Sequence, residues 1–339
     1  MGSLTGKRIL FIAPTFFGYE KEIKEKMISL GASVDFFDER PSNDFITKSL
    51  IRINRNLIAK KNDEHYESII SSTKDNFYDY ILLIRGEAIS RKKLKELKIS
   101  NPKSKLILYL WDSINYNPNT KRIMDLFDSI YTFDINDANK YKEMKFRPLF
   151  YIDIYNEISN ESITDDSIDL LFVGTVHTDR YLVLQSIKKQ LDYQGVNYYF
   201  YMYYPSKLLF WVKKLFDPKF RSANMSDFNF KGLNKQELRN FYKRSKVILD
   251  IERPKQVGLT IRTLEVMGAK KKLITTNESV KKYDLYNSKN IFIVNRDKPE
   301  ISKEFFVEKG AEIDKKIYSY YSIEAWIKEV LSSGENSSN

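Results

Sequence analysis

Two stretches in the C-terminal half contain residues that could bind a phosphorylated ligand. The first, 172–180 (FVGTVHTDR), is an apolar strand pattern that runs into a turn with Gly174 and Thr175 and then into a helix carrying Arg180. Backbone N–H groups at the start of a helix favour a phosphate, and a guanidinium adds a charge-assisted hydrogen bond. An ordinary strand–turn–helix unit with a surface arginine is the alternative interpretation.

The second stretch, 250–269 (DIERPKQVGLTIRTLEVMGA), places a loop with Arg253 and Gly258 after a buried strand and begins a helix near Thr260. Arg262 and Glu265 are three residues apart on this helix and therefore share a face. A cation beside helix-start amides suits a diphosphate, and a carboxylate, which only accepts hydrogen bonds, suits the two hydroxyls of a ribose. A surface Arg–Glu ion pair is the alternative.

The N-terminal half offers carboxylates for proton transfer. Asp112 comes at the carboxyl end of an apolar strand pattern, where a base could take the proton of an acceptor hydroxyl. Glu87 and Glu20 are further candidates at the same edge, and helix capping or a structural hydrogen bond is the alternative role for Asp112. Trp111 and Tyr116 could stack on a sugar, although Trp111 also suits a core.

The elements that position these residues form two αβ halves. Apolar runs at 7–13, 34–37, 80–84, 106–111 and 130–133 predict strands, and helical patterns lie between them, including one at 121–127. A polar, acidic stretch at 157–167 predicts a linker, after which the alternation of strands and helices restarts. In the helix expected over 179–191, Tyr181, Leu184, Ile187 and Leu191 recur at helical spacing. We expect an N-terminal domain over 1–156, a C-terminal domain over 168–322, and a terminal helix and tail over 323–339.

Composition narrows the possible functions. The 339 residues contain no Cys and two His, which excludes disulfides, Cys-ligated metals and a thiol nucleophile. The sequence shows no membrane-length apolar run, no signal peptide, no Gly-x-Gly-x-x-Gly, no Walker loop, no Gly-x-Ser-x-Gly and no Asp-x-Asp after a strand. The net charge of +11 suits nucleic acid, an anionic membrane or phosphorylated substrates.

The residues from Gly258 to Asn277 resemble the nucleotide-sugar site of GT-B glycosyltransferases, in particular the group-1 branch with CgeB-like and bacterial surface-polysaccharide transferases. The resemblance implies that Glu265 binds the donor ribose and that Arg262 and Gly258 serve the diphosphate. Val257 stands where many members of that branch carry a first Glu, so Gln256 or Asp250 would have to replace it. The full set of expected donor-binding residues is Gly174, Thr175, Arg180, Arg253, Gly258, Leu259, Thr260, Arg262 and Glu265.

The segment 206–221 (SKLLFWVKKLFDPKFR) predicts a basic amphipathic helix. Six apolar side chains share one arc of this helix, and Phe210 falls outside the arc, among the lysines. A helix of this kind can lie in a membrane interface, and a surface helix packed on its own domain is the alternative. The expected membrane-surface residues are Lys207, Trp211, Lys213, Lys214 and Phe216.

Together these observations predict an α/β protein of the GT-B fold, with two Rossmann-like parallel-sheet domains facing a cleft. We expect a metal-independent transferase that moves a hexosyl or related group from a nucleoside-diphosphate sugar to a lipopolysaccharide, capsule or other glycan. Its partners would be the donor, which is a co-substrate so that no cofactor is needed, and a glycan or lipid-linked acceptor. It would be cytoplasmic, at the inner face of the cytoplasmic membrane. A basic nucleic-acid-binding protein, disfavoured because no known motif is found, and a non-catalytic sugar-nucleotide binder of the same fold are the alternatives.

Overall fold

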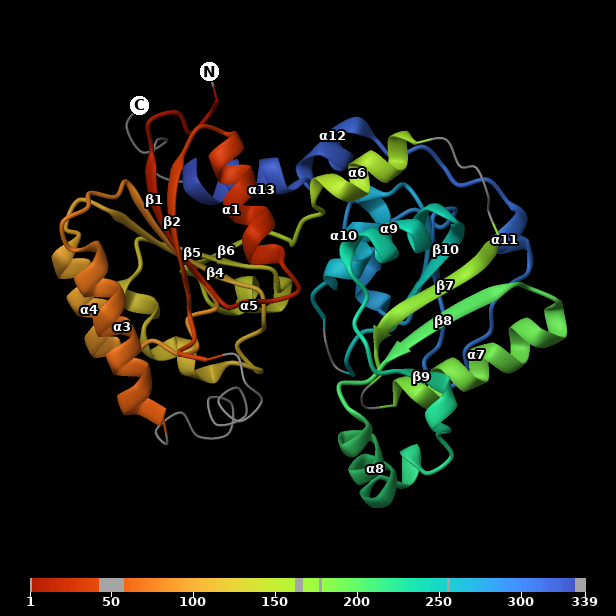
Figure 1. Ribbon diagram of the computed structural model, residues 1–339. Coiled ribbons are helices and arrows are strands. Elements are labelled where there is room, and N and C mark those ends of the chain that lie inside the picture. The colour runs from red at the N-terminus through yellow and green to blue at the C-terminus, as the bar shows by residue number, and fades with distance from the viewer. Residues whose placement is uncertain (1, 43–57, 162–166, 177–178, 255–256, 333–339) are drawn as a thin grey trace. The chain divides into compact units, whose positions relative to one another are not determined.

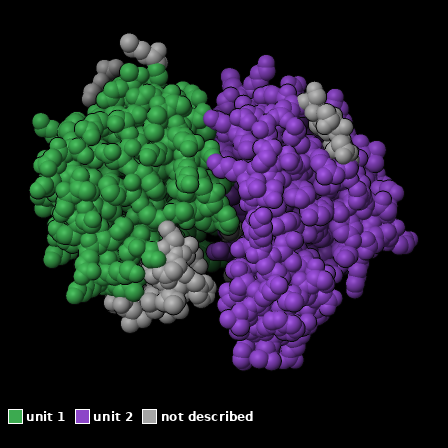
Figure 2. All heavy atoms as spheres, viewed as in Figure 1, with its two compact units in different colours: residues 1–149, 323–339 green, residues 150–322 purple. Residues whose placement is uncertain are grey.

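The computed structural model describes residues 2–42, 58–161, 167–176, 179–254 and 257–332. The chain divides into two compact units (Figure 2): unit 1 contains residues 1–149 and 323–339, and unit 2 contains residues 150–322. The first unit thus ends at residue 149 where the sequence pattern placed a boundary at 156, and the C-terminal helix belongs to unit 1.

Unit 1 is built on a six-stranded, entirely parallel sheet with the strand order β2-β1-β3-β4-β5-β6 (Figure 1). Leu10 and Ile12 of β1 lie in one cluster of buried side chains, and the alternate residues Ile9 and Phe11 are fully buried as well. Runs that are apolar on both faces are typical of parallel strands covered on both sides. The strands are β1 (Arg8–Ala13), β2 (Ser33–Asp38), β3 (Tyr80–Ile84), β4 (Lys105–Leu110), β5 (Ser129–Thr132) and β6 (Met144–Phe146).

Four of the described helices of unit 1 pack in two pairs. Helix α1 (Tyr19–Ser29) contacts α13 (Ile323–Ser332), and α3 (Ala59–Thr73) contacts α4 (Arg91–Ser100). Trp326 fixes α13 to the sheet, because its buried ring stands edge-on to Tyr109 of β4 with the ring centroids 4.7 Å apart. The remaining elements are α5 (Ile135–Lys140) and the 3₁₀ helices η2 (Pro118–Arg122) and η3 (Met124–Leu126).

Unit 2 repeats this plan with a second parallel sheet, in the order β12-β11-β10-β7-β8-β9. The strands are β7 (Ile168–Thr175), β8 (Tyr198–Tyr203), β9 (Phe228–Asn229), β10 (Ser245–Asp250), β11 (Lys272–Thr275) and β12 (Ile291–Ile293). The helices are α6 (Asp153–Asn160), α7 (Arg180–Gln194), α8 (Lys207–Phe216), α9 (Lys235–Lys243), α10 (Ile261–Gly268), α11 (Glu304–Val307) and α12 (Lys315–Tyr320), with 3₁₀ helices η4 (Pro218–Phe220), η5 (Met225–Asp227) and η6 (Glu278–Lys282).

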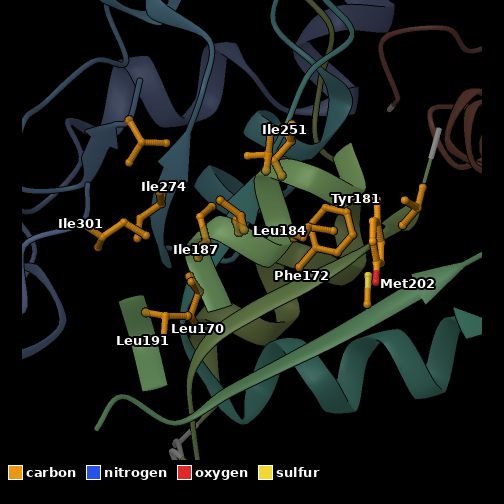
Figure 3. Close-up of a cluster of buried hydrophobic side chains, with 14 of the residues drawn as sticks. Leu170, Phe172, Tyr181, Leu184, Ile187, Leu191, Met202, Ile251, Ile274 and Ile301 are labelled. Atoms are coloured by element: carbon orange, nitrogen blue, oxygen red, sulfur yellow. The ribbon is translucent and has the colours of Figure 1, made fainter. Parts of the chain in front are cut away.

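The core of unit 2 lies between α7 and the sheet. Figure 3 shows Leu184, Ile187 and Leu191 of α7 in one buried cluster with Leu170 and Phe172 of β7. All four apolar positions expected at helical spacing along this helix are buried, which confirms that prediction. The expected α/β class, with two parallel sheets, is confirmed too.

Three local predictions are wrong. The linker expected over 157–167 is wrong for residues 157–160, which belong to α6: Tyr155 packs against Tyr242, and the acidic Glu157 and Glu161 pair with Arg239 of α9. Residues 162–166 of that prediction lie outside the described residues. The helix expected over 121–127 is replaced by the two short 3₁₀ helices η2 and η3. The third correction concerns Gly174 and Thr175, which lie inside β7.

Candidate functional site

The carboxyl ends of the parallel strands of unit 2 bring charged residues to one edge of the sheet. Asp179 and Arg180 follow β7, and Glu252 and Arg253 follow β10. Arg296 follows β12 and is a residue that the sequence analysis missed. Only its place just after a short apolar strand could have indicated it. Loops beyond the carboxyl ends of such strands are where ligands of open α/β sheets bind.

Four arginines gather at this edge. Burial above all, and then the nearby positive charges of Arg253, Arg296 and Arg262, lower the pKa of Arg180 to about 10, while Asp250 acts in the opposite direction. A guanidinium keeps its proton at such a value, so the shift measures how unfavourable its charge is in this place. An anion bound among these side chains would relieve that repulsion.

Arg180 makes a hydrogen bond to the backbone and has a guanidinium nitrogen that lacks a partner among the described residues. Its Nη1 donates to the carbonyl oxygen of Thr175 at 2.8 Å, whereas its buried Nε has no hydrogen-bond partner among the described residues. A buried, unpaired charged donor is costly and calls for an acceptor. Arg180 therefore offers a preformed donor to a ligand oxygen.

Arg262 and Glu265 form a pair on α10, as their spacing predicts, but the pair is largely buried. Nη1 of Arg262 lies 3.0 Å from Oε2 of Glu265 and donates to the hydroxyl oxygen of Tyr242 at 2.7 Å. Nη2 of Arg262 donates to the carbonyl oxygen of Val173 at 3.1 Å, which joins α10 to β7. The Tyr242 hydroxyl is also 3.2 Å from Oε2 of Glu265, so one carboxylate oxygen is already engaged inside the protein.

Asp250 and Glu252 place negative charge beside the positive charges of the four arginines. Asp250 accepts hydrogen bonds from the hydroxyls of Thr260 at 2.5 Å and Thr263 at 3.3 Å, which ties the start of α10 to the end of β10. Burial raises the pKa of Asp250 above its ordinary value. Glu252 is likewise buried and lies 2.8 Å from Nη1 of Arg296.

Arg296 connects Glu252 to Asp179. It makes a two-pronged ion pair with Asp179, Nε to Oδ2 at 2.7 Å and Nη2 to Oδ1 at 2.9 Å. Planar pairing of this kind fixes a guanidinium in orientation. The network thus anchors the loop before α7 to the loop after β10.

The other expected donor residues take varied places. Gly174 and Thr175 are paired with β8 inside the sheet and form no turn, because the strand continues to Thr175. The side chain of Leu259 is buried, so only its backbone could face a ligand, and Gly258 accepts a hydrogen bond from Asn277 at 3.4 Å. His177 and Gln256 lie outside the described residues.

Unit 1 gathers carboxylates and arginines at the carboxyl ends of β2, β3 and β4. Arg85 lies 3.1 Å from Glu87 and 3.2 Å from Asp112, and Arg40 lies 3.4 Å from Glu87. Arg85 has a φ angle of 80°, a left-handed conformation that few residues other than glycine adopt. Glu87 is buried and holds both arginines, whereas the side chain of Asp112 is 28% exposed. Of these two candidate bases, Asp112 is more accessible than Glu87.

Glu39, which the sequence analysis missed, lies in the same cluster. Its Oε1 accepts hydrogen bonds from the backbone N–H groups of Glu87 and Ala88, and its Oε2 has no partner among the described residues. Burial, and then the negative charge of Glu87, raise the pKa of Glu39 to about 7 against the lowering effect of Arg85. Its place directly after β2 is the only sequence signal it gives.

Aromatic side chains lie beside this cluster. Trp111 is half-buried, so the core role is wrong, and its ring contacts that of exposed Phe16 with the centroids 5.6 Å apart. Tyr116 is exposed. The carboxylate of Glu20 accepts from the backbone N–H of Phe16 at 3.0 Å, which gives it a structural role at the start of α1.

The residues expected at a membrane surface lie on α8. Trp211 and Phe216 are exposed, while Phe210 is fully buried. No helix in the described part of the chain is both long and apolar enough to cross a bilayer. Within the same residues, no three His, Cys, Asp or Glu side chains are grouped so that they could hold a metal ion.

Comparison with known proteins identifies the fold. No family model and no curated protein matches the sequence. The structure is similar to that of Anabaena HepE in complex with UDP and glucose, with a TM-score of 0.62, 12% identity, and 96% of this chain and 100% of that chain covered. It is similar to an alpha-glucosyltransferase in complex with UDP and DNA (TM-score 0.57, 13% identity, 96% of each chain) and to UDP-GlcNAc 2-epimerase from Methanocaldococcus jannaschii (TM-score 0.54, 10% identity, 96% and 100%). The chain has the GT-B fold, with two Rossmann-like domains.

Proposed function

We propose that the protein is a glycosyltransferase that moves a sugar from a nucleoside-diphosphate sugar to a glycan acceptor, such as a lipopolysaccharide or capsule chain. The observation that carries this is the cluster of four arginines in unit 2, in which the Nε of Arg180 has no hydrogen-bond partner among the described residues. Similar structures bind UDP and glucose, or UDP together with DNA, which supports a nucleotide ligand for the same fold.

In this reaction the bond between the anomeric carbon and the diphosphate oxygen breaks, and a hydroxyl oxygen of the acceptor bonds to the anomeric carbon. The negative charge that develops on the leaving diphosphate would be stabilised by Arg180 and Arg262, so that no metal ion is required. Glu265 would accept hydrogen bonds from the ribose hydroxyls. The acceptor proton would pass to a carboxylate of unit 1, and Asp112 is the accessible candidate.

Ligand-induced thermal shifts test the donor site. The protein is heated with UDP-, GDP-, dTDP- and CMP-sugars, each at about 100 times its dissociation constant, where bound ligand stabilises the fold by about 2.7 kcal/mol. We expect a shift with one nucleotide class that disappears in Arg180→Ala and weakens in Glu265→Ala. Glu278→Ala, which removes an exposed carboxylate from the same unit, is the matched control and should keep the shift.

A turnover assay distinguishes sugar transfer from epimerisation and from ligand binding without catalysis. Release of the nucleoside diphosphate should depend on an added glycan acceptor, should persist in EDTA, and should fall at least 100-fold in Asp112→Asn with donor binding unchanged. Because a similar structure belongs to a UDP-GlcNAc 2-epimerase, conversion of the donor sugar without an acceptor would contradict transfer. Donor binding without any turnover would identify a non-catalytic binder, and salt-steep affinity for oligonucleotides with no donor shift would identify a nucleic-acid-binding protein.

A further inference from the structure

Helix α8 of unit 2 turns an apolar face toward solvent. Leu208, Trp211, Leu215 and Phe216 are 75%, 55%, 69% and 76% exposed, and Val212 beside them is exposed as well. At 100° per residue these five side chains occupy a single arc of the helix. Isolated exposed apolar residues are ordinary, but a contiguous group of five on one short helix marks a surface that binds something.

The helix is held by its opposite side. Phe210 is fully buried, and its ring packs against Phe228 at 5.2 Å, Phe220 at 5.3 Å and Tyr204 at 6.0 Å between centroids. The side chain of Ser206 caps the helix by accepting from the backbone N–H of Leu209. Since this anchor fixes the rotation of the helix, the outward direction of the apolar arc is built into the fold and needs no rearrangement.

Basic residues flank this face. The segment 206–221 contains five Lys or Arg residues and one Asp. The ammonium group of Lys214 lies over the ring of Trp211 and donates to the carbonyl oxygen of Ala223, and Lys213 pairs with Asp217. Lys207, at the start of the helix, is exposed. Lysines beside an apolar face place their charges at the level of lipid headgroups when that face is inserted.

We propose that the exposed apolar face of α8 docks onto an anionic lipid bilayer. Charge decides between occupants: a second copy of this face would bring two sets of lysines together, whereas anionic headgroups complement them. Helix α8 follows the carboxyl end of β8, the neighbour of β7, and therefore lies at the same edge of the sheet as Arg180 (Figure 1). Docking would hold that edge near the membrane surface, where a lipid-linked acceptor would be presented.

Vesicle co-sedimentation of the full chain tests this. With vesicles of phosphatidylcholine and phosphatidylglycerol at 7:3, the wild type should bind, and it should bind at least tenfold more weakly to pure phosphatidylcholine. The double variant Leu208→Glu/Phe216→Glu should lose at least tenfold in partitioning. The matched control is Ile99→Glu/Val307→Glu, which adds the same two charges at side chains of similar exposure, 76% and 81%, and should lose less than twofold.

Tryptophan fluorescence gives a second readout that does not depend on the variants folding equally well. Emission should shift to the blue on anionic vesicles and be quenched by brominated lipid in the wild type, and neither change should occur in Trp211→Phe. Equal losses in the two double variants would show that binding depends on net charge alone and would overturn the proposal. So would an absence of vesicle binding, including the case in which light scattering shows a dimer that Leu208→Glu/Phe216→Glu dissociates.

Discussion

Replacing Glu39 by Gln should remove a pH-dependent contribution to the stability of unit 1. The structure raises the pKa of this buried carboxyl to about 7 from an ordinary value of 4.5, chiefly through burial. A shift of about 2.5 units corresponds to about 3 kcal/mol, at 1.36 kcal/mol per unit. Because the folded state binds the proton more tightly than the unfolded state, this stabilisation is complete below pH 4.5 and is lost as the pH rises through 7.

The assay is denaturant unfolding of wild type and Glu39→Gln at intervals from pH 5 to pH 8. The chain has three Trp, and Trp111 and Trp326 both lie in unit 1. In a Trp211→Phe background, tryptophan emission therefore reports on unit 1 alone. Differences between the two proteins isolate Glu39 from other groups that titrate in this range.

We expect the free energy of unfolding of the protein with Glu39 to fall by about 2.5 kcal/mol relative to the Gln variant as the pH rises from 5 to 8, because at pH 5 the carboxyl of the unfolded chain is already largely ionised. Gln keeps the oxygen that accepts from the N–H groups of Glu87 and Ala88, so the cluster should persist. A difference that stays constant within about 0.5 kcal/mol, or that grows in favour of Glu39 with pH, would refute a raised pKa and with it the buried carboxylate cluster.

Three further predictions concern packing in unit 2. Phe210→Ala should destabilise the unit by about 4 kcal/mol, because the buried ring that anchors α8 is lost, whereas Trp211→Ala should cost less than about 0.5 kcal/mol. Urea titration followed by circular dichroism measures both costs, and similar costs would contradict the orientation of α8. Gly268→Ala should destabilise the unit by about 1–3 kcal/mol despite the helix propensity of Ala, because the added Cβ would lie 2.5 Å from the ring of Tyr151. An unchanged or higher melting temperature would show that the backbone of residue 268 does not pack tightly against this ring. Thr260→Ala should lower the free energy of unfolding by about 1 kcal/mol through loss of the N-cap of α10, while Thr260→Ser, which keeps the hydroxyl, should be nearly neutral. Calorimetry measures both effects, and equal losses of stability would contradict the capping role.

The strands, the main helices and the local chemistry of short segments follow from the sequence by itself. The run at 80–84 is strand β3 with the expected bounds, and the spacing of Tyr181, Leu184 and Ile187 identified the buried side of α7. Arg262 and Glu265 meet because a helix brings residues three apart onto one face. These features depend on local periodicity, which the order of residues contains directly.

Contacts between distant segments were decided by the tertiary structure. Glu39 meets the backbone of Glu87 across 48 residues, and Arg296 meets Asp179 across 117, only because parallel strands deliver their carboxyl ends to a common edge in an order that the sequence does not state. The same holds for α8. Its periodicity shows two faces, but the packing of Phe210 against Phe220 and Phe228 selects which face is buried and leaves the larger apolar face in solvent.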